Sequence, residues 1–125
     1  MSARTEEVVR SFCAAFARRD IDELLGFFTP DAVYHNVPLQ PVRGLEGIRS
    51  TFEMFVAPAE RAEFEILHMA SVDDVVLNER IDRFVVGGRQ VSLPVAGVFV
   101  VRDGKIAAWR DYFDMQMYLR QTGSA

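Results

Sequence analysis

The chain has 125 residues, half of them hydrophobic and about a quarter charged, a composition typical of one globular domain. Its net charge of −4 and its isoelectric point near 5.1 argue against a basic surface for nucleic acids. Charged residues interrupt every apolar run before it reaches the length of a membrane span, and the first residues lack the apolar core of a signal peptide. We therefore expect a cytoplasmic protein whose residues 1–125 form a single domain.

Helical patterns occupy much of the first sixty residues. Apolar residues recur every four positions around Phe12, and a pattern that opens with an acidic N-cap at Asp20 follows. Cys13, the only cysteine, lies in the first apolar stripe, so a buried thiol is a simpler interpretation than a nucleophile. The expected elements are a helix around 8–16, a short helix over 20–28, a strand over 32–36, a loop over 37–44 and a helix from 45 that stops near Pro58.

From residue 64 onward the period changes from that of a helix to that of a strand. Apolar and polar side chains alternate, and Gly87-Gly88 and Asp103-Gly104 supply turn residues. Helices followed by a meander predict an α+β fold, with the helices against one face of a curved antiparallel sheet. The expected strands run from 64 to the turn at 73–74, over 75–86, over 89–101 and over 105–112, before a helical turn near 115–119.

Two acids inside strand-like segments are the most informative residues. Asp82 shares a face with Arg80, and Asp111 shares a face with Trp109 and Phe113, because side chains alternate along a strand. Burying a carboxylate is expensive unless it is paired. Two inward acids, one arginine and aromatic neighbours therefore indicate a pocket for proton transfer.

Several of these residues have a simpler interpretation when each is taken alone. Arg80 and Asp82 could form a structural ion pair, the Tyr34 hydroxyl could meet water, and Asn36 could open the loop that follows it. Other polar residues receive no catalytic role, and the two histidines lack the spacing of metal ligands. We expect His35 at the surface, His68 partly buried, and Arg110 and Asp114 in a surface or interface ion pair.

Three segments together resemble the signatures of limonene-1,2-epoxide hydrolases, and the predicted order of elements is also that of the family. The segments are Tyr34-His35-Asn36-Val37-Pro38, Glu79-Arg80-Ile81-Asp82 and Trp109-Arg110-Asp111-Tyr112-Phe113-Asp114. The family has the cone-shaped α+β fold of nuclear transport factor 2, shared with ketosteroid isomerases and polyketide cyclases. The resemblance implies a strongly curved mixed or antiparallel sheet with N-terminal helices on its concave face, and a homodimer.

The resemblance also implies the roles of five polar residues in a one-step hydrolysis of an epoxide to a vicinal diol. Asp82 would be the general acid and Asp111 the general base, with Arg80 between them and with Tyr34 and Asn36 holding the water. No metal or cofactor is implied, and the partners would be water and a small, largely apolar epoxide. Residues placed to form the apolar lining are Leu39, Met54, Phe84, Leu93, Val95, Trp109 and Phe113.

Two other functional classes stay open. A ketosteroid-isomerase-like or polyketide-cyclase-like enzyme needs one carboxylate base and neutral donors for an enolate, which an Asp-Arg-Asp set suits poorly. A non-catalytic small-molecule-binding domain has no reason to keep two acids in an apolar cavity. The strands over 75–86 and 89–101 also carry apolar residues on both faces, such as Ile81, Val85 and Val98, so we expect a homodimer that covers the outer face.

Overall fold

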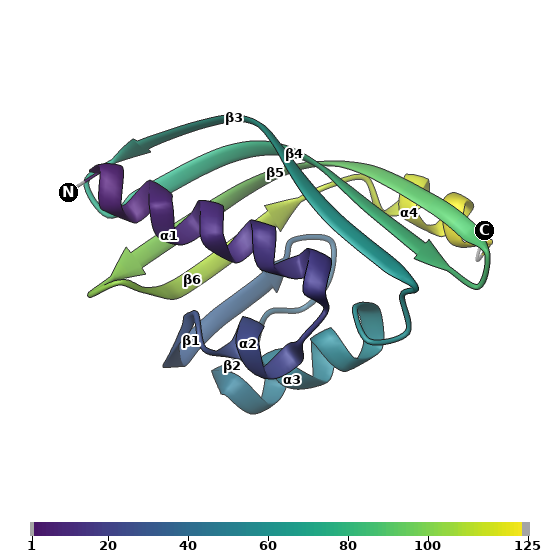
Figure 1. Cartoon of the computed structure of the whole chain (residues 1–125), viewed down its shortest axis with the longest axis horizontal. Helices are drawn as coiled ribbons and strands as arrows, with labels where there is room; N and C mark the ends of the chain where they lie inside the picture. Colours follow the sequence, from purple (N-terminus) through teal and green to yellow (C-terminus); the bar gives the residue numbers. More distant parts are fainter. Residues whose placement is uncertain (1, 124–125) are drawn as a thin grey trace.

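The computed structural model describes residues 2–123, with side chains from Arg4 onward (Figure 1). The N-terminal part comprises α1 (Ser2–Ala15), the 3-10 turn η1 (Phe16–Arg18), α2 (Ile21–Leu25), β1 (Phe28–Asn36), β2 (Val42–Arg43) and α3 (Gly44–Phe55). It is followed by β3 (Arg61–Val72), β4 (Val75–Val86), β5 (Arg89–Arg102), β6 (Lys105–Tyr112) and α4 (Met115–Thr122). Among residues 2–123, no helix combines the length and the apolar character that crossing a membrane requires.

The six strands form one mixed sheet in the order β2-β1-β6-β5-β4-β3. Strands β3 to β6 are joined by tight turns and pair antiparallel, as the alternating pattern predicts. Strand β1 pairs with β6 in parallel and with β2 antiparallel. The α+β class is thus confirmed, and the parallel β1–β6 pair brings the first strand of the chain beside the last.

The N-terminal helices cover one face of the sheet and enclose an aromatic core. Figure 1 shows α1 running beneath β3 and β4, with α2 and α3 beside β1 and with α4 at the opposite end of the molecule. Phe12 of α1 sits at the centre of this core, with its ring edge-on to those of Phe16, Phe28 and Trp109 at centroid distances of 5.0–5.2 Å. Cys13 is buried here as predicted, and burial raises the pKa of its thiol to about 12.

The boundary between α2 and β1 differs from the prediction of a helix that extends through Phe28. The backbone N–H of Gly26 bonds back to the carbonyl groups of Asp22 and Glu23 and closes the helix after Leu25. Phe28 already pairs with Ile106 of β6. This parallel pairing joins segments that are distant in the sequence, so the local helical pattern could not reveal it. The expected loop over 37–44 also contains a short strand, β2.

Two polar residues also behave differently from the prediction. Asp114 is not part of an ion pair with Arg110 but caps α4, where its Oδ1 accepts a hydrogen bond from Met117 N at 3.1 Å. The side chain of His68 is 84% exposed rather than partly buried. A bulge between Ile66 and His68 shifts the alternation of β3 by one residue and turns the ring outward, where Nδ1 lies 2.8 Å from Glu79 Oε1.

Candidate active site

Three neighbouring strands position the acidic pair and its arginine. Arg80 and Asp82 lie on the inner face of β4, and Asp111 lies on β6, with Gly97 of β5 between them. A Cβ built on Gly97 would stand only 2.4 Å from Arg80 Nη1 and 3.0 Å from Asp111 Oδ1. The missing side chain therefore opens the passage through which Arg80 reaches across β5 to Asp111.

The Arg80 guanidinium bridges both acids and is fully buried. Its Nε and Nη2 donate to Asp82 Oδ1 and Oδ2, both at 2.9 Å. Its Nη1 and Nη2 donate to Asp111 Oδ1 at 3.2 Å and Oδ2 at 2.8 Å. Phe64 lies under the guanidinium, with its ring centroid 4.9 Å from Cζ. Burial lowers the pKa of Arg80, but the two carboxylates outweigh burial and hold the pKa well above its usual value.

The two acids differ in their surroundings. Burial raises the pKa of Asp82 to about 6, against the lowering influence of Arg80 and with a further raising influence of Asp111. Asp111 receives a third hydrogen bond from Trp109 Nε1, which donates to Oδ1 at 2.7 Å. An ionised carboxylate is a pure acceptor, and three donors around Asp111 match that form. The arrangement therefore favours a proton on Asp82 and a negative charge on Asp111.

Tyr34 and Asn36 approach the acids from β1. Asn36 is the register partner of Asp111 in the parallel β1–β6 pair, and Tyr34 is the partner of Trp109, on whose ring it stacks at 4.1 Å. The Tyr34 hydroxyl donates to Asn36 Oδ1 at 3.1 Å, and burial raises the pKa of Tyr34 above its usual value. Asn36 Oδ1 accepts this bond, and among the described residues Asn36 Nδ2 has no hydrogen-bond partner, so Nδ2 can hold a water molecule beside Asp111.

A cavity connects these polar groups with an apolar lining. Tyr34, Asn36, Asp82 and Asp111 all border it, and about 80 Å³ is open to the centres of water molecules, room for several of them. The site thus combines two carboxyl groups in different surroundings with space for a small molecule. Of the lining residues predicted from the sequence, the structure places Leu39, Phe84, Leu93, Val95 and Phe113 at the wall.

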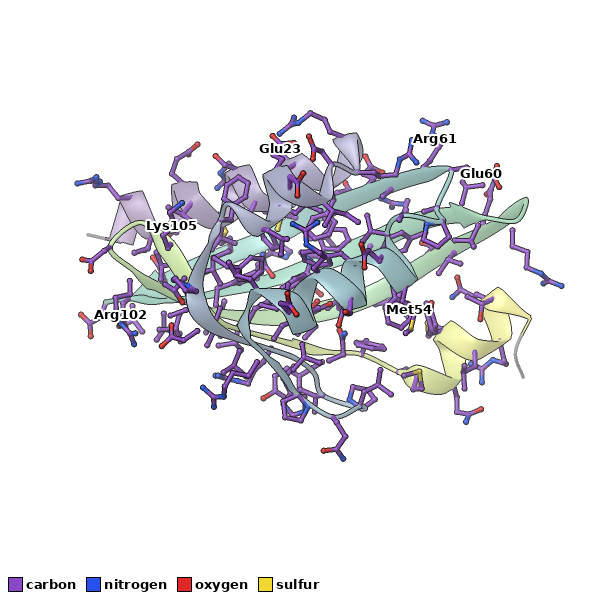
Figure 2. The ribbon with its side chains drawn as sticks, turned by 90° about the horizontal axis from the view of Figure 1, so that it is seen from below. Glu23, Met54, Glu60, Arg61, Arg102 and Lys105 are labelled. Carbon is purple, nitrogen blue, oxygen red and sulfur yellow. The ribbon has the colours of Figure 1, made fainter. Side chains whose placement is uncertain are left out.

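Met54 and Trp109 do not line the cavity, so the structure corrects these two placements. Met54 is 67% exposed near the end of α3 (Figure 2), because Thr51, Phe52 and Phe55 occupy the cavity side of that helix. Trp109 is buried behind Tyr34 in the aromatic core and reaches the site only through its indole N–H.

Sequence reasoning overlooked two residues of the polar cluster and part of the cavity wall. Asn78 and Gly97 both contact Arg80, and a glycine inside a strand could have indicated the close approach. Residues of α4 that the sequence analysis left without a role also border the cavity. These residues are Met115, Tyr118 and Thr122.

Helix α4 is held in place by a side chain that pairs with the backbone of β5. Gln121 Oε1 accepts a hydrogen bond from Ser92 N at 2.5 Å, and its Nε2 donates to Ser92 O at 2.9 Å. Strand β6 pairs with β5 only from Ala96 onward, so Gln121 takes up part of an open strand edge. The cavity wall formed by α4 is thus anchored to the sheet.

Comparisons with known proteins decide which of the enzymes with this architecture the chain resembles. The catalytic domain of limonene-1,2-epoxide hydrolase matches residues 3–123. This chain belongs to the limonene-1,2-epoxide hydrolase family. It is similar to the epoxide hydrolase EphG of Mycobacterium tuberculosis, with 37% identity over 109 residues that make up 86% of this chain and 71% of the relative.

Solved structures of the family and of its wider fold agree with this assignment. An LEH-like epoxide hydrolase of M. tuberculosis superposes with a TM-score of 0.80 and 30% identity, over 98% of this chain and 95% of the other. A structure described as a putative polyketide cyclase from Xanthomonas campestris reaches 0.85 at 22% identity, over 96% of this chain and 97% of the other. The second likeness shows the fold alone, that of nuclear transport factor 2, which hosts several activities.

Proposed function

We propose that this epoxide hydrolase of the limonene-1,2-epoxide hydrolase type adds water to a small, largely apolar epoxide in one concerted step. Asp82 donates a proton to the epoxide oxygen as its C–O bond breaks. Asp111 takes a proton from the water as the oxygen of that water bonds to the ring carbon. The product is a vicinal diol, and each positioned acid or base contributes about 10²- to 10⁴-fold to the rate.

The observation that carries this proposal is the sharing of one guanidinium by two carboxylates of unequal environment. An epoxide opens to a poor alkoxide leaving group, so the acid must keep its proton until the bond breaks. The raised pKa of Asp82 supports that role, and the three donors around Asp111 support the role of base. Four N–H groups of Arg80 are committed to the carboxylates, and Arg80 does not border the cavity, whereas Asp82 does and can act as the acid.

The cavity supports a substrate with few polar groups. Away from the acids its wall consists mainly of aromatic and aliphatic side chains, such as Phe52, Phe84 and Leu93. An apolar ligand gains by leaving water for such a wall, whereas a charged one would lose its hydration without a partner. We include in the proposal a cone-shaped fold, as in the structural neighbours, and a single domain over 1–125, which the family match over 3–123 supports; the sheet itself is not strongly curled.

An isotope experiment tests the reaction. The protein is incubated with a panel of cyclic and aryl epoxides in ¹⁸O-water under single-turnover conditions, with the Asp82→Asn variant as the control. We expect the label in the diol and none in the protein. Label in Asp82 or Asp111 would indicate an ester intermediate and contradict the one-step reaction, and a wild-type protein that turns over none of the epoxides would contradict the function.

We also propose that the outer face of the sheet forms a homodimer. Leu77 and Tyr112 are 48% and 47% exposed there, close to the half-buried Ile81, Val98 and Val100, and charged residues such as Glu79 and Arg110 lie among them. An apolar face with both signs of charge can complement a second copy of itself around a twofold axis. Light scattering at micromolar concentration should give a dimer for the wild type and a monomer for Val98→Asp, and a monomeric wild type would refute the proposal.

A further inference from the structure

Asn78 is a buried amide next to the catalytic cluster. It lies on β4 two residues before Arg80, on the same face, with only 5% of its surface exposed. It does not border the substrate cavity. Its presence in the core is costly unless both ends of the amide are used, so its partners indicate what it does.

The amide oxygen completes the hydrogen bonding of Arg80. A guanidinium has five N–H donors, and four of them bond to the carboxylates of Asp82 and Asp111. The fifth donates from Nη1 to Asn78 Oδ1 at 3.0 Å. On the other side of the amide, Nδ2 faces Cys13 Sγ at 3.9 Å, a weak acceptor that fixes which end of the amide points to Arg80.

The contact between Asn78 and Arg80 is closely packed by its other neighbours. A Cβ on Gly97 would lie 2.8 Å from Asn78 Oδ1 and 2.4 Å from Arg80 Nη1. Phe64 and Phe99 lie against the guanidinium, with ring centroids 4.9 Å and 5.9 Å from its Cζ. Without the amide oxygen, one buried N–H of Arg80 would lose its protein acceptor.

We propose that Asn78 is a positioning residue that acts through Arg80, by fixing the plane of the guanidinium across both carboxylates with an acceptor that carries no charge. The inference rests on the proposed function and adds a residue to it. A neutral acceptor matters because the cluster then holds one positive charge and two acids, and so keeps one proton.

The charge of the acceptor is as important as its position. The titratable groups that face the cluster are Arg80 and Asp82 on β4, Asp111 on β6, Tyr34 on β1 and Cys13 on α1. A carboxylate at position 78 would add a third acid to one guanidinium. Like charges favour protonation, so the cluster would hold its proton to higher pH.

The first experiment removes the acceptor. In Asn78→Ala the guanidinium can tilt away from the geometry that aligns both acids, and we expect kcat to fall at least about tenfold with KM within about twofold, because Asn78 does not contact substrate. Val76→Ala is the control, since Val76 is equally buried on the same face of β4 but lies in the apolar core. It should lower the melting temperature without changing kcat. Equal effects of both variants on kcat would reduce Asn78 to a structural residue and overturn the proposal.

The second experiment changes only the charge. Asn78→Asp keeps an acceptor of the same shape. In a plot of kcat against pH, we expect its alkaline limb to shift to higher pH by about one unit. Isotope-labelled aspartate followed by NMR gives the same shift for the carboxyl of Asp82 without turnover. An unshifted carboxyl titration in a folded Asn78→Asp protein would overturn the proposal. If the titration shifts in Asn78→Asp but the wild-type protein hydrolyses no epoxide, the role of Asn78 is supported and the proposed function is rejected.

Discussion

Trp109 supports Asp111 from behind the cavity, with its indole Nε1 only 2.7 Å from Asp111 Oδ1. The same indole stacks on Tyr34 at 4.1 Å and on Phe99 at 5.7 Å. One buried ring therefore orients the proposed base and also the tyrosine beside the proposed water site. Trp109 itself lies behind the cavity wall and contacts Tyr34 and Asp111, which border the cavity.

Removing the indole N–H should leave the proposed base, Asp111, less well positioned while the stacking on Tyr34 remains. Trp109→Phe keeps an aromatic ring against Tyr34 but leaves Arg80 as the one donor to Asp111 Oδ1 among the described residues. We expect kcat to fall about tenfold or more, because the alignment of the base is disturbed. Steady-state kinetics gives kcat, and thermal unfolding gives the loss of stability that the smaller ring causes. Unchanged kcat in a stable variant would show that the hydrogen bond does not position the base.

Substitution of either acid alone should lower kcat by a similar factor. Asp82→Asn removes the transferable proton and Asp111→Asn removes the base, so each should lower kcat by at least about 10²-fold. Because both act in one step, the double variant should be scarcely slower than either single variant. Arg80→Lys should also be strongly impaired, since an ammonium cannot bridge two carboxylates as a planar fork does. The measurement is single-turnover diol formation, and near-normal turnover by folded Asp82→Asn would exclude Asp82 as the acid.

Activity should be lost as pH rises through the pKa of Asp82. Only the protonated form of Asp82 donates, and its pKa is about 6, so kcat/KM should decline above that pH. An apolar substrate displaces water and disfavours the charged form further, so the alkaline limb of kcat should lie at higher pH than that of kcat/KM. A rate that rises with pH across this range would contradict the assignment of the acid.

The same titration has a consequence for folding stability. The pKa of Asp82 is raised on folding above its ordinary value of 3.8, so the folded state binds the proton more tightly than the unfolded chain does. The stabilisation from this group is fully present below pH 4 and declines between about pH 4 and 6. Denaturant unfolding should show this decline for the wild type and a smaller one for Asp82→Asn. Parallel curves would indicate that Asp82 does not titrate in this range.

A single methyl group at position 97 should disrupt the whole cluster. In Gly97→Ala the new Cβ would stand 2.4 Å from Arg80 Nη1 and 2.8 Å from Asn78 Oδ1, closer than packed atoms allow. We expect a loss of stability of about 1–3 kcal/mol, as for other overpacked sites, together with a large loss of kcat. Ala96→Gly, at the neighbouring exposed position of β5, is the control for altering the strand itself. A folded Gly97→Ala protein with normal kinetics would show that the cluster can shift without penalty.

Local patterns predicted the meander and most of the polar site. Alternation over 75–86 and 105–112 was enough to place Asp82 and Asp111 on the inner face. The parallel pairing of β1 with β6 is non-local, so neither the start of β1 at Phe28 nor the neighbourhood of Asn36 and Asp111 could be derived from periodicity. Met54 was misplaced because the face that a helix turns toward a cavity depends on how the helix packs.

Asn78 illustrates a different limit. It shares the face of Arg80 and Asp82 by the same alternation, yet a lone amide in a strand gives no signal of its own. Its importance becomes visible only when the five donors of Arg80 are matched with their acceptors, which requires coordinates. Gly97 is similar, because the close approach that it allows involves side chains from two other strands.

The shared guanidinium also bears on how the enzyme returns to its starting state. If Asp82 gives a proton and Asp111 receives one, each turnover leaves the charge of the cluster unchanged but inverts the two protonation states. Arg80 bonds to both acids, so whichever of them is ionised keeps the guanidinium as its partner. The cycle then closes only when one proton travels from Asp111 back to Asp82. Asp82 and Asp111 both border the cavity, so water that enters it after the diol leaves can relay that proton.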